Sequence, residues 1–249
     1  QAIDLAVQHH TAGDLPKAEG IYQQVLQAEP NQPVALHLLG VIAHQVGKND
    51  ISVDLITKAL TIKPDYAEAH NNLGLTLQEL GQLDEAVTSY NEAIAIKPEY
   101  AEAYYNLGNT LQALGHLNDA VASYSKAIVI KPDFSEAHCN LGNSLKKLGN
   151  HNEASTSYNM ALSIKPDYAE AHSNLGNVLR ELKRFDEAVA SCSKALSIKP
   201  DYAEAYLNLG NVLKDLGKFD EAVASYNKAI TINPGYAIAY SNLGNAFKE

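Results

Sequence analysis

Asparagine side chains recur along this chain in two series with fixed spacing. The first series stands directly before a Leu-Gly pair and consists of Asn72, Asn106, Asn140, Asn174, Asn208 and Asn242. The second series lies three residues further on and consists of Asn109, Asn143, Asn177, Asn211 and Asn245. An amide side chain offers both a donor and an acceptor, so it can bind the N–H and C=O of a peptide whatever the ligand's sequence. The two series therefore predict a surface that holds an extended polypeptide by its backbone.

The spacing of such a surface would suit an extended ligand. Neighbouring packed helices lie roughly 10 Å apart, and an extended chain advances about 3.3 Å per residue. One asparagine could therefore hold every third residue of the ligand. A second interpretation stays open, in which the same amides form hydrogen bonds between neighbouring repeats and contact no ligand.

Two further kinds of residue accompany the first asparagine series. Glutamates stand four residues before it, and Glu102, Glu136 and Glu170 are candidates for a secondary part of the groove that selects basic ligands. Their spacing from a preceding aspartate also fits a purely structural role in helix capping. The fifth place of the repeat, which precedes the asparagine where one is present, varies as His37, Asn71, Tyr105, Cys139, Ser173, Leu207 and Ser241. Variation fits either a specificity-determining position, with Tyr105 as a peptide contact, or an unconstrained surface position.

Other kinds of site are not supported by the residue spacing. The histidines at 70, 138 and 172 share a place with Tyr104, Tyr206 and Tyr240, which indicates packing and no ligand spacing for a metal. Cys139 and Cys192 lie in different repeats, so neither a disulfide nor a nucleophilic site is expected. No glycine-rich phosphate loop is present. We expect no catalytic residue, no metal and no cofactor, and therefore no enzyme activity.

The elements that position these residues follow a period of 34 residues, and such a period is the signature of a stacked repeat protein. Each repeat holds two runs of apolar or small residues at three- and four-residue steps, which predicts two amphipathic helices. A repeat array has no internal domain boundary, so residues 1–249 are expected to form one solenoid. Its repeats span 1–32 (truncated at the start), 33–66, 67–100, 101–134, 135–168, 169–202, 203–236 and a half repeat at 237–249.

The glycines, aspartates and prolines at the expected helix ends fit the same helix-turn-helix pattern. A glycine such as Gly81 follows the first helix, where a left-handed backbone costs glycine least. Lys183 replaces that glycine in one repeat and predicts a looser turn there. Asp65 and its equivalents are expected to cap the first helices, and Asp84 and its equivalents the second helices. Proline ends each second helix.

A second glycine in each repeat, such as Gly74, stands inside the predicted first helix. Glycine costs roughly 1 kcal/mol relative to alanine in a helix interior. A close approach of the second helix at the small residue Ala86 would offset this cost. We therefore expect Gly74 and its equivalents to face Ala86 and its equivalents.

The repeat resembles the tetratricopeptide repeat, whose pattern is matched by Leu73-Gly74, Leu77, Ala86, Tyr90, Ala93 and Pro98. The repeat sequence is also similar to that of the repeat region of O-linked N-acetylglucosamine transferase and of bacterial tetratricopeptide repeat proteins. The resemblance implies an all-α, right-handed α-solenoid whose first helices line a concave groove. It also implies recognition of extended protein segments by an asparagine ladder. Cationic clamps for acidic tails, as in chaperone-binding members, are absent from the corresponding places.

Composition narrows the range of partners. The net charge is -10 and the pI is about 5.3, whereas nucleic acids and anionic membranes require a basic footprint. We expect a neutral to basic protein or peptide partner, no nucleic acid and no membrane. Two cysteines with no expected disulfide fit a reducing compartment, so we expect a cytoplasmic protein.

The predicted function is a protein–protein interaction scaffold that binds an extended peptide in its concave groove. Two alternatives stay open. The chain could be the substrate-recruiting arm of a larger enzyme, such as a glycosyltransferase or a sulfotransferase-like protein, because it ends inside a first helix with Ala246 and Phe247 uncovered. It could also be a structural repeat that self-associates through an exposed end.

Overall fold

The computed structural model describes residues 1–246, and all regular secondary structure in that range is helical. The chain divides into two compact units, at residues 1–130 and 131–249. The N-terminal unit contains α1 (Ala2–Thr11), α2 (Leu15–Ala28), α3 (Pro33–Gln45), α4 (Asn49–Ile62), α5 (Ala67–Glu79), α6 (Leu83–Ile96), α7 (Ala101–Ala113) and α8 (Leu117–Ile130). The C-terminal unit contains α9 (Ser135–Lys147), α10 (His151–Ile164), α11 (Ala169–Glu181), α12 (Phe185–Ile198), α13 (Ala203–Asp215), α14 (Phe219–Ile232) and α15 (Ala237–Ala246).

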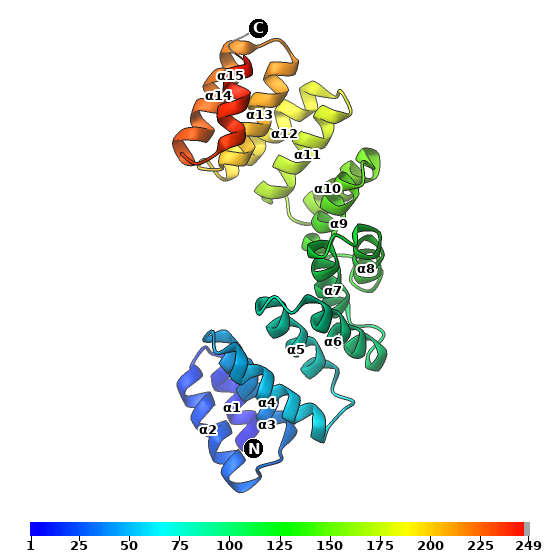
Figure 1. Ribbon diagram of the computed structural model, residues 1–249, viewed down its shortest axis with the longest axis vertical. Coiled ribbons are helices and arrows are strands. Elements are labelled where there is room, and N and C mark those ends of the chain that lie inside the picture. The colour runs from blue at the N-terminus through cyan, green and yellow to red at the C-terminus, as the bar shows by residue number, and fades with distance from the viewer. Residues whose placement is uncertain (247–249) are drawn as a thin grey trace. The chain divides into compact units, whose positions relative to one another are not determined.

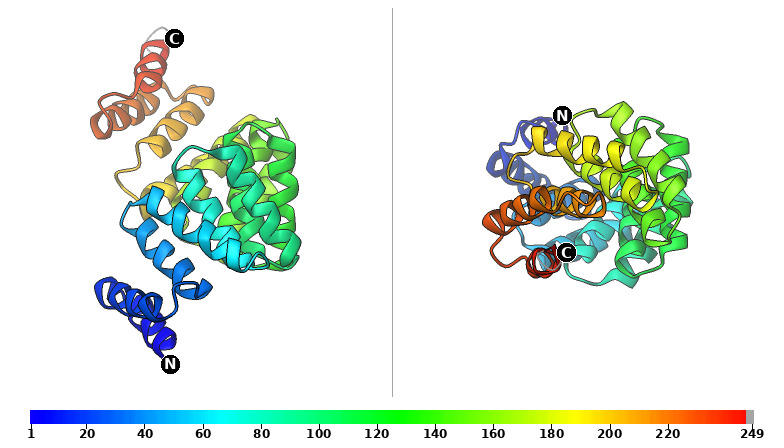
Figure 2. Two further views of the ribbon diagram at one scale, coloured as in Figure 1. Left: turned by 60° about the horizontal axis from the view of Figure 1, so that its bottom comes forward. Right: turned by 90° about the horizontal axis from the view of Figure 1, so that it is seen from above.

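Helices are paired in the order of the chain. Each odd-numbered helix up to α13 packs against the even-numbered helix that follows it, and these are the first and second helices of one repeat (Figure 1). Within each unit the second helix then packs against the first helix of the next repeat, so that consecutive pairs lie side by side (Figure 2). The first helices also touch one another, α3 with α5 and α11 with α13. The all-α helical-repeat fold is as predicted.

Glycine forms the turn inside the repeats by taking a left-handed backbone. Gly81, for example, has a φ of 75°. Its N–H donates to the carbonyl of Gln78, and the next N–H, of Gln82, donates to that of Leu77. This pair of bonds satisfies carbonyls at the helix end that would otherwise have no partner.

The prediction of a looser turn at Lys183 is wrong. Lys183 takes a φ of 62° and makes the same two bonds, with Lys183 N donating to Arg180 O and Arg184 N to Leu179 O, both at 2.9 Å. The side chain is therefore forced into a backbone region that favours glycine. The turn is kept because the helix-end carbonyls still need these donors.

Lys183→Gly should consequently stabilise the chain by about 0.5–1 kcal/mol, because glycine removes the strain of a left-handed lysine. The gain is limited by loss of the Lys183 ammonium, which lies 5.8 Å from the Phe185 ring centre. Urea unfolding followed by circular dichroism measures the change. The reverse substitution Gly149→Lys, at a turn with a φ of 81°, should destabilise the chain. Equal midpoints for all three proteins would contradict the strain argument.

The predicted caps of the helices are wrong. At α5 the N-cap residue is Tyr66 and no side chain caps the helix, because Asp65 lies one residue too early. At α6 the helix begins at Leu83, before Asp84, which places this carboxylate in the first turn, near the positive end of the helix dipole. Side-chain caps do occur at α2, where Asp14 accepts from Lys17 N, and at α3, where Gln32 accepts from Ala35 N.

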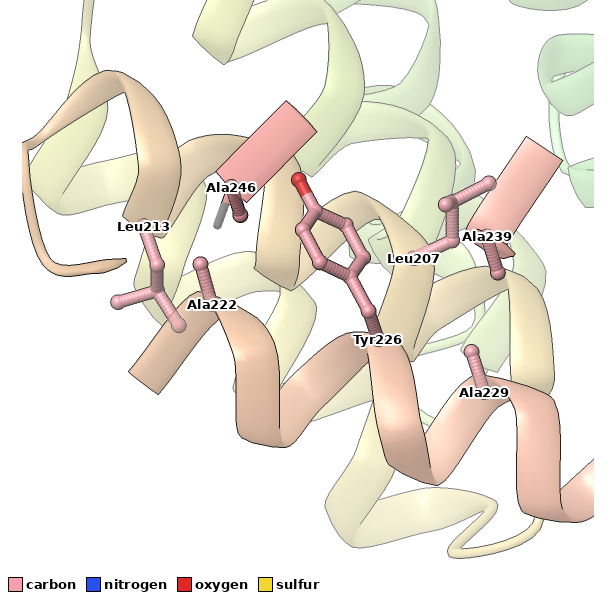
Figure 3. Packing of buried hydrophobic residues seen from close by; sticks show 7 residues of the cluster. All are labelled: Leu207, Leu213, Ala222, Tyr226, Ala229, Ala239 and Ala246. Atoms are coloured by element: carbon pink, nitrogen blue, oxygen red, sulfur yellow. The ribbon is translucent and has the colours of Figure 1, made fainter. Parts of the chain in front are cut away.

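The packing partner predicted for the helix-interior glycine also needs correction. A Cβ atom added at Gly74 would lie 2.6 Å from Cε1 of Tyr90, so its nearest neighbour is a tyrosine ring. Gly108, Gly142 and Gly210 meet Tyr124, Tyr158 and Tyr226 in the same way. These tyrosines are fully buried. In Figure 3 the Tyr226 ring projects from α14 among the neighbouring alanines and leucines of one core cluster. The predicted approach to the alanine is seen at Gly176, where an added Cβ would lie 3.1 Å from the backbone oxygen of Ala188.

No helix within residues 1–246 combines the length and the apolar character that crossing a membrane requires.

Candidate functional site

The first asparagine series forms hydrogen bonds to the preceding repeat. In the N-terminal unit Asn106 Nδ2 donates to Asn71 Oδ1 at 3.0 Å, and Asn72 Nδ2 lies 2.8 Å from His37 Nε2. In the C-terminal unit Asn174 Nδ2 donates to Asn143 Oδ1 at 3.0 Å and Asn208 Nδ2 to Ser173 Oγ at 2.9 Å. Asn242 Nδ2 likewise donates to Asn211 Oδ1 at 2.8 Å. The amide N–H groups thus hold adjacent first helices together.

The second asparagine series accepts hydrogen bonds from the buried tyrosines of the same repeats. The hydroxyl of Tyr124 donates to Asn109 Oδ1 at 2.8 Å, that of Tyr158 to Asn143 at 2.7 Å and that of Tyr226 to Asn211 at 3.0 Å. Asn177 differs, because Cys192 replaces the tyrosine and has no hydroxyl to donate. Three repeats therefore each fix one asparagine from inside the core.

Two tyrosines lack such an asparagine and differ in outcome. Val7 stands at the asparagine place in the repeat of Tyr22, and the Tyr22 hydroxyl has no hydrogen-bond partner among residues 1–246. Leu75 stands there in the repeat of Tyr90, whose hydroxyl donates to Gln78 Oε1 at 3.3 Å.

These bonds determine how much of the predicted surface is open to a ligand. Asn174 and Asn208 are only 5% and 4% exposed, whereas Asn72, Asn106, Asn140 and Asn242 are half-buried. Asn143 donates to Asn140 Oδ1 at 3.3 Å in addition to accepting two bonds. The inter-repeat hydrogen bonds of the second interpretation are therefore present. A ligand contact by the same residues stays a prediction.

The variable fifth place of the repeat is buried in most repeats and is not an open surface position. Cys139 and Ser173 are fully buried, and His37, Asn71 and Leu207 are nearly so. The reason is that the loop at the end of the same repeat covers this position, as where Tyr66 OH lies 2.9 Å from His37 Nδ1. Tyr105 is half-buried, with its ring centre 6.0 Å from that of Tyr124.

The glutamates of the predicted secondary groove lie beside lysines that end the second helices. Glu68 forms an ion pair with Lys97 at 3.1 Å, and Glu136 with Lys165 at 4.0 Å. The Lys97 ammonium also lies 4.6 Å from the ring centre of Tyr100. Glu102 and Glu170 are exposed. These pairs are partly exposed, and such pairs stabilise proteins little.

Three cations on the same helix face escaped the sequence analysis. Lys146, Arg180 and Lys214 occupy the place where two earlier repeats carry Gln78 and Gln112. Lys146 Nζ donates to Asn174 Oδ1 at 3.0 Å, and burial lowers the pKa of this lysine. Arg180 contacts Glu181 and, at 3.7 Å, Asp215. The recurrence of polar residues at this place was the signal that could have revealed them.

The three histidines at the shared place lie against backbone carbonyls, and both cysteines are buried, which fits structural roles. Nε2 of His70, His138 and His172 lies 3.0–3.1 Å from the carbonyl oxygens of Pro64, Pro132 and Pro166. No group of three potential metal ligands occurs within residues 1–246. Cys139 and Cys192 are free and buried, and burial raises the pKa of each thiol to about 12.

Two family models match the sequence. The model described as "TPR repeat" matches residues 77–115, 113–149, 142–179, 176–217 and 210–249, and the one described as "Tetratricopeptide repeat" matches 55–88. No curated protein matches the chain.

Solved structures of repeat proteins share the fold. MamA is 28% identical, with a TM-score of 0.61, over 66% of this chain and 96% of its own. YrrB, described as a TPR protein with an unusual peptide-binding site, is 24% identical, with a TM-score of 0.64, over 75% of this chain and 96% of its own. A tetratricopeptide repeat protein from Parabacteroides merdae is 20% identical, with a TM-score of 0.67, over 99% and 97%.

The repeated helix pairs, the buried glycine–tyrosine contacts and the family matches lead to one assignment. Tetratricopeptide repeat proteins are generally non-catalytic scaffolds that bind protein or peptide partners. The chain belongs to the tetratricopeptide repeat family.

Proposed function

We propose that the chain is a scaffold that binds an extended protein segment along the first helices α9, α11 and α13, through Asn140, Asn174 and Asn208. The observation that carries this proposal is the fixed orientation of these amides. Asn208 is held by Ser173, and Asn174 by Asn143 and Lys146. Side chains already ordered before binding lose little conformational entropy when a ligand arrives.

The polar groups around these asparagines fit a peptide backbone. Asn208 donates through Nδ2 and leaves Oδ1 as an acceptor for a peptide N–H. Lys146 could exchange its bond to Asn174 for a peptide carbonyl, because a lysine ammonium reorients easily. The exposed carboxylate of Glu170 and the net charge of -10 favour a neutral to basic segment. The peptide-binding site named for YrrB supports the same class of ligand.

Asn208→Ala should weaken capture of the partner from a lysate of the source organism by about fivefold, because one backbone hydrogen bond is lost. Mass spectrometry of material retained by the immobilised chain measures the loss. The triple variant Asn140→Ala, Asn174→Ala, Asn208→Ala should abolish capture.

Ser173→Ala is the matched control for this experiment. It removes the same inter-repeat hydrogen bond from its other end, and Ser173 is fully buried and cannot touch a ligand. Capture should therefore persist in Ser173→Ala at a similar loss of stability. An equal loss of capture in Asn208→Ala and Ser173→Ala would mean that Asn208 has only a structural role.

A further inference from the structure

In the N-terminal unit α3 packs against both α2 and α4 (Figure 1). Residues of these three helices and of the turn after α3 line a pocket of about 330 Å³. Its lining combines Leu39, Ile42 and Ala43 of α3 with Ile51 and Leu55 of α4. Val46 and Ile51 are each 51% exposed at its edge. The pocket takes no part in the asparagine surface, since its residues come from other faces of these helices.

Three lining residues depart from what the other repeats carry at the same places. Ala43 stands where five repeats have leucine, at Leu77, Leu111, Leu145, Leu179 and Leu213. Ile51 stands where the same repeats have an acid, at Glu85, Asp119, Glu153, Glu187 and Glu221. Leu55 stands where they have serine, at Ser89, Ser123, Ser157, Ser191 and Ser225.

The departures act together on one pocket. Alanine in place of leucine removes side-chain volume from the floor, while isoleucine and leucine in place of acid and serine make the wall and edge apolar. Exposing apolar residues in place of charged ones gains nothing for a chain in water, and such a patch is typical of an interaction site. Volume and lining together fit one bulky apolar side chain.

Charged groups on the rim restrict what can flank that side chain. Glu19 and Lys48 both line the pocket. Glu19 Oε1 accepts from Gln23 at 3.0 Å. Within residues 1–246, neither Glu19 nor the Lys48 ammonium forms an ion pair. A partner can therefore pair with both charges if it carries one basic and one acidic residue around its apolar anchor.

We propose that this pocket docks a second protein segment, in which a bulky apolar residue is flanked by a basic residue that pairs with Glu19 and an acidic residue that pairs with Lys48. The pocket adds an anchoring point outside the asparagine surface, so that one chain could hold two different segments. Multivalent attachment of this kind raises overall affinity without new contacts at either site.

Fluorescence polarisation with short synthetic peptides tests the proposal. The probes carry Leu, Phe or Trp between Lys and Glu in both orders, and matched probes carry Lys on both sides or an alanine anchor. We expect at least one probe with an apolar anchor and mixed charges to bind, and Ala43→Leu to weaken it by at least about tenfold by filling the pocket. Lys48→Glu should weaken the same probe severalfold.

Ala43→Leu restores the residue of the other repeats, so circular dichroism should show an intact fold. If it does not fold, Ile51→Glu at the exposed edge replaces it and should weaken the probe equally. Asn208→Ala should leave this binding unchanged, which separates the pocket from the asparagine surface.

The proposal is overturned if no probe binds at about 1 mM, the weak end of specific association, or if binding survives both pocket variants. It is also overturned if sedimentation shows a dimer that Ala43→Leu dissociates, because a second copy would then be the occupant.

Discussion

Gly142→Leu should lower the free energy of unfolding by about 3 kcal/mol and the thermal midpoint by at least about 5 °C. A Cβ atom at Gly142 would already lie 2.7 Å from Cε1 of Tyr158. The ring cannot move aside, because Tyr158 is fully buried and its hydroxyl donates to Asn143 at 2.7 Å. Differential scanning calorimetry measures the change.

Gly20 offers a matched control. It also lies inside a helix, α2, but a Cβ atom there would meet nothing within 4 Å. Gly20→Leu should therefore leave stability unchanged or raise it slightly, because leucine has the better helix propensity. Combining Gly142→Leu with Tyr158→Ala should cost less than the sum of the single changes, since the clash is removed. Simple additivity, or an unchanged midpoint in Gly142→Leu, would refute the contact.

The sequence was enough to predict the helices but not the contacts between them. The period indicates that Gly74 and its equivalents are kept for packing. It does not indicate which side chain of the second helix contacts the glycine. The long Tyr90 ring reaches the glycine from the same helix that carries Ala86. The helix starts were misjudged for a related reason. Asp84 is a residue type that often caps helices, but the helix already begins at Leu83, so Asp84 lies in its first turn.

The sequence was enough to predict which helix face carries the candidate site, but not which hydrogen bonds its residues form. Asn174 and Asn208 share the expected face, but their partners depend on how far adjacent repeats are shifted along each other. That shift brings Asn143 to Asn174 and Ser173 to Asn208. The period contains no information about it. Departures from the repeat pattern, in contrast, coincide with a specific structural feature. Ala43 differs from the leucine of the other repeats, and it lines the pocket.

His37 is the residue through which acid should destabilise this fold most. It is 2% exposed in α3. An amide nitrogen can only donate, so Nε2 accepts from Asn72 Nδ2 at 2.8 Å. The ring proton then lies on Nδ1 and is donated to the hydroxyl of Tyr66 at 2.9 Å. Protonation would break the bond from Asn72 and place a charge in a buried site.

Burial lowers the pKa of His37 from 6.5 to about 4, against a smaller opposing effect of Glu68. Between these pKa values the unfolded chain binds the proton more readily than the folded chain does. Stability should therefore be full above about pH 6.5 and fall as the pH drops towards about 4. One pKa difference of this size corresponds to about 3 kcal/mol, of which about 2 kcal/mol should be lost by about pH 5.

His37→Asn should flatten this pH dependence, because asparagine is the natural residue at the same place in the next repeat. There Asn71 Oδ1 accepts from Asn106 Nδ2 at 3.0 Å, as His37 Nε2 accepts from Asn72. Urea unfolding between about pH 7.5 and pH 5 measures the difference, and NMR titration of the His37 ring measures its pKa directly. His172→Tyr is the control, since Tyr206 occupies that place in the next repeat, and it should keep most of the wild-type slope. An equal slope in wild type and His37→Asn would show that other groups carry the acid sensitivity and that the buried imidazole titrates normally.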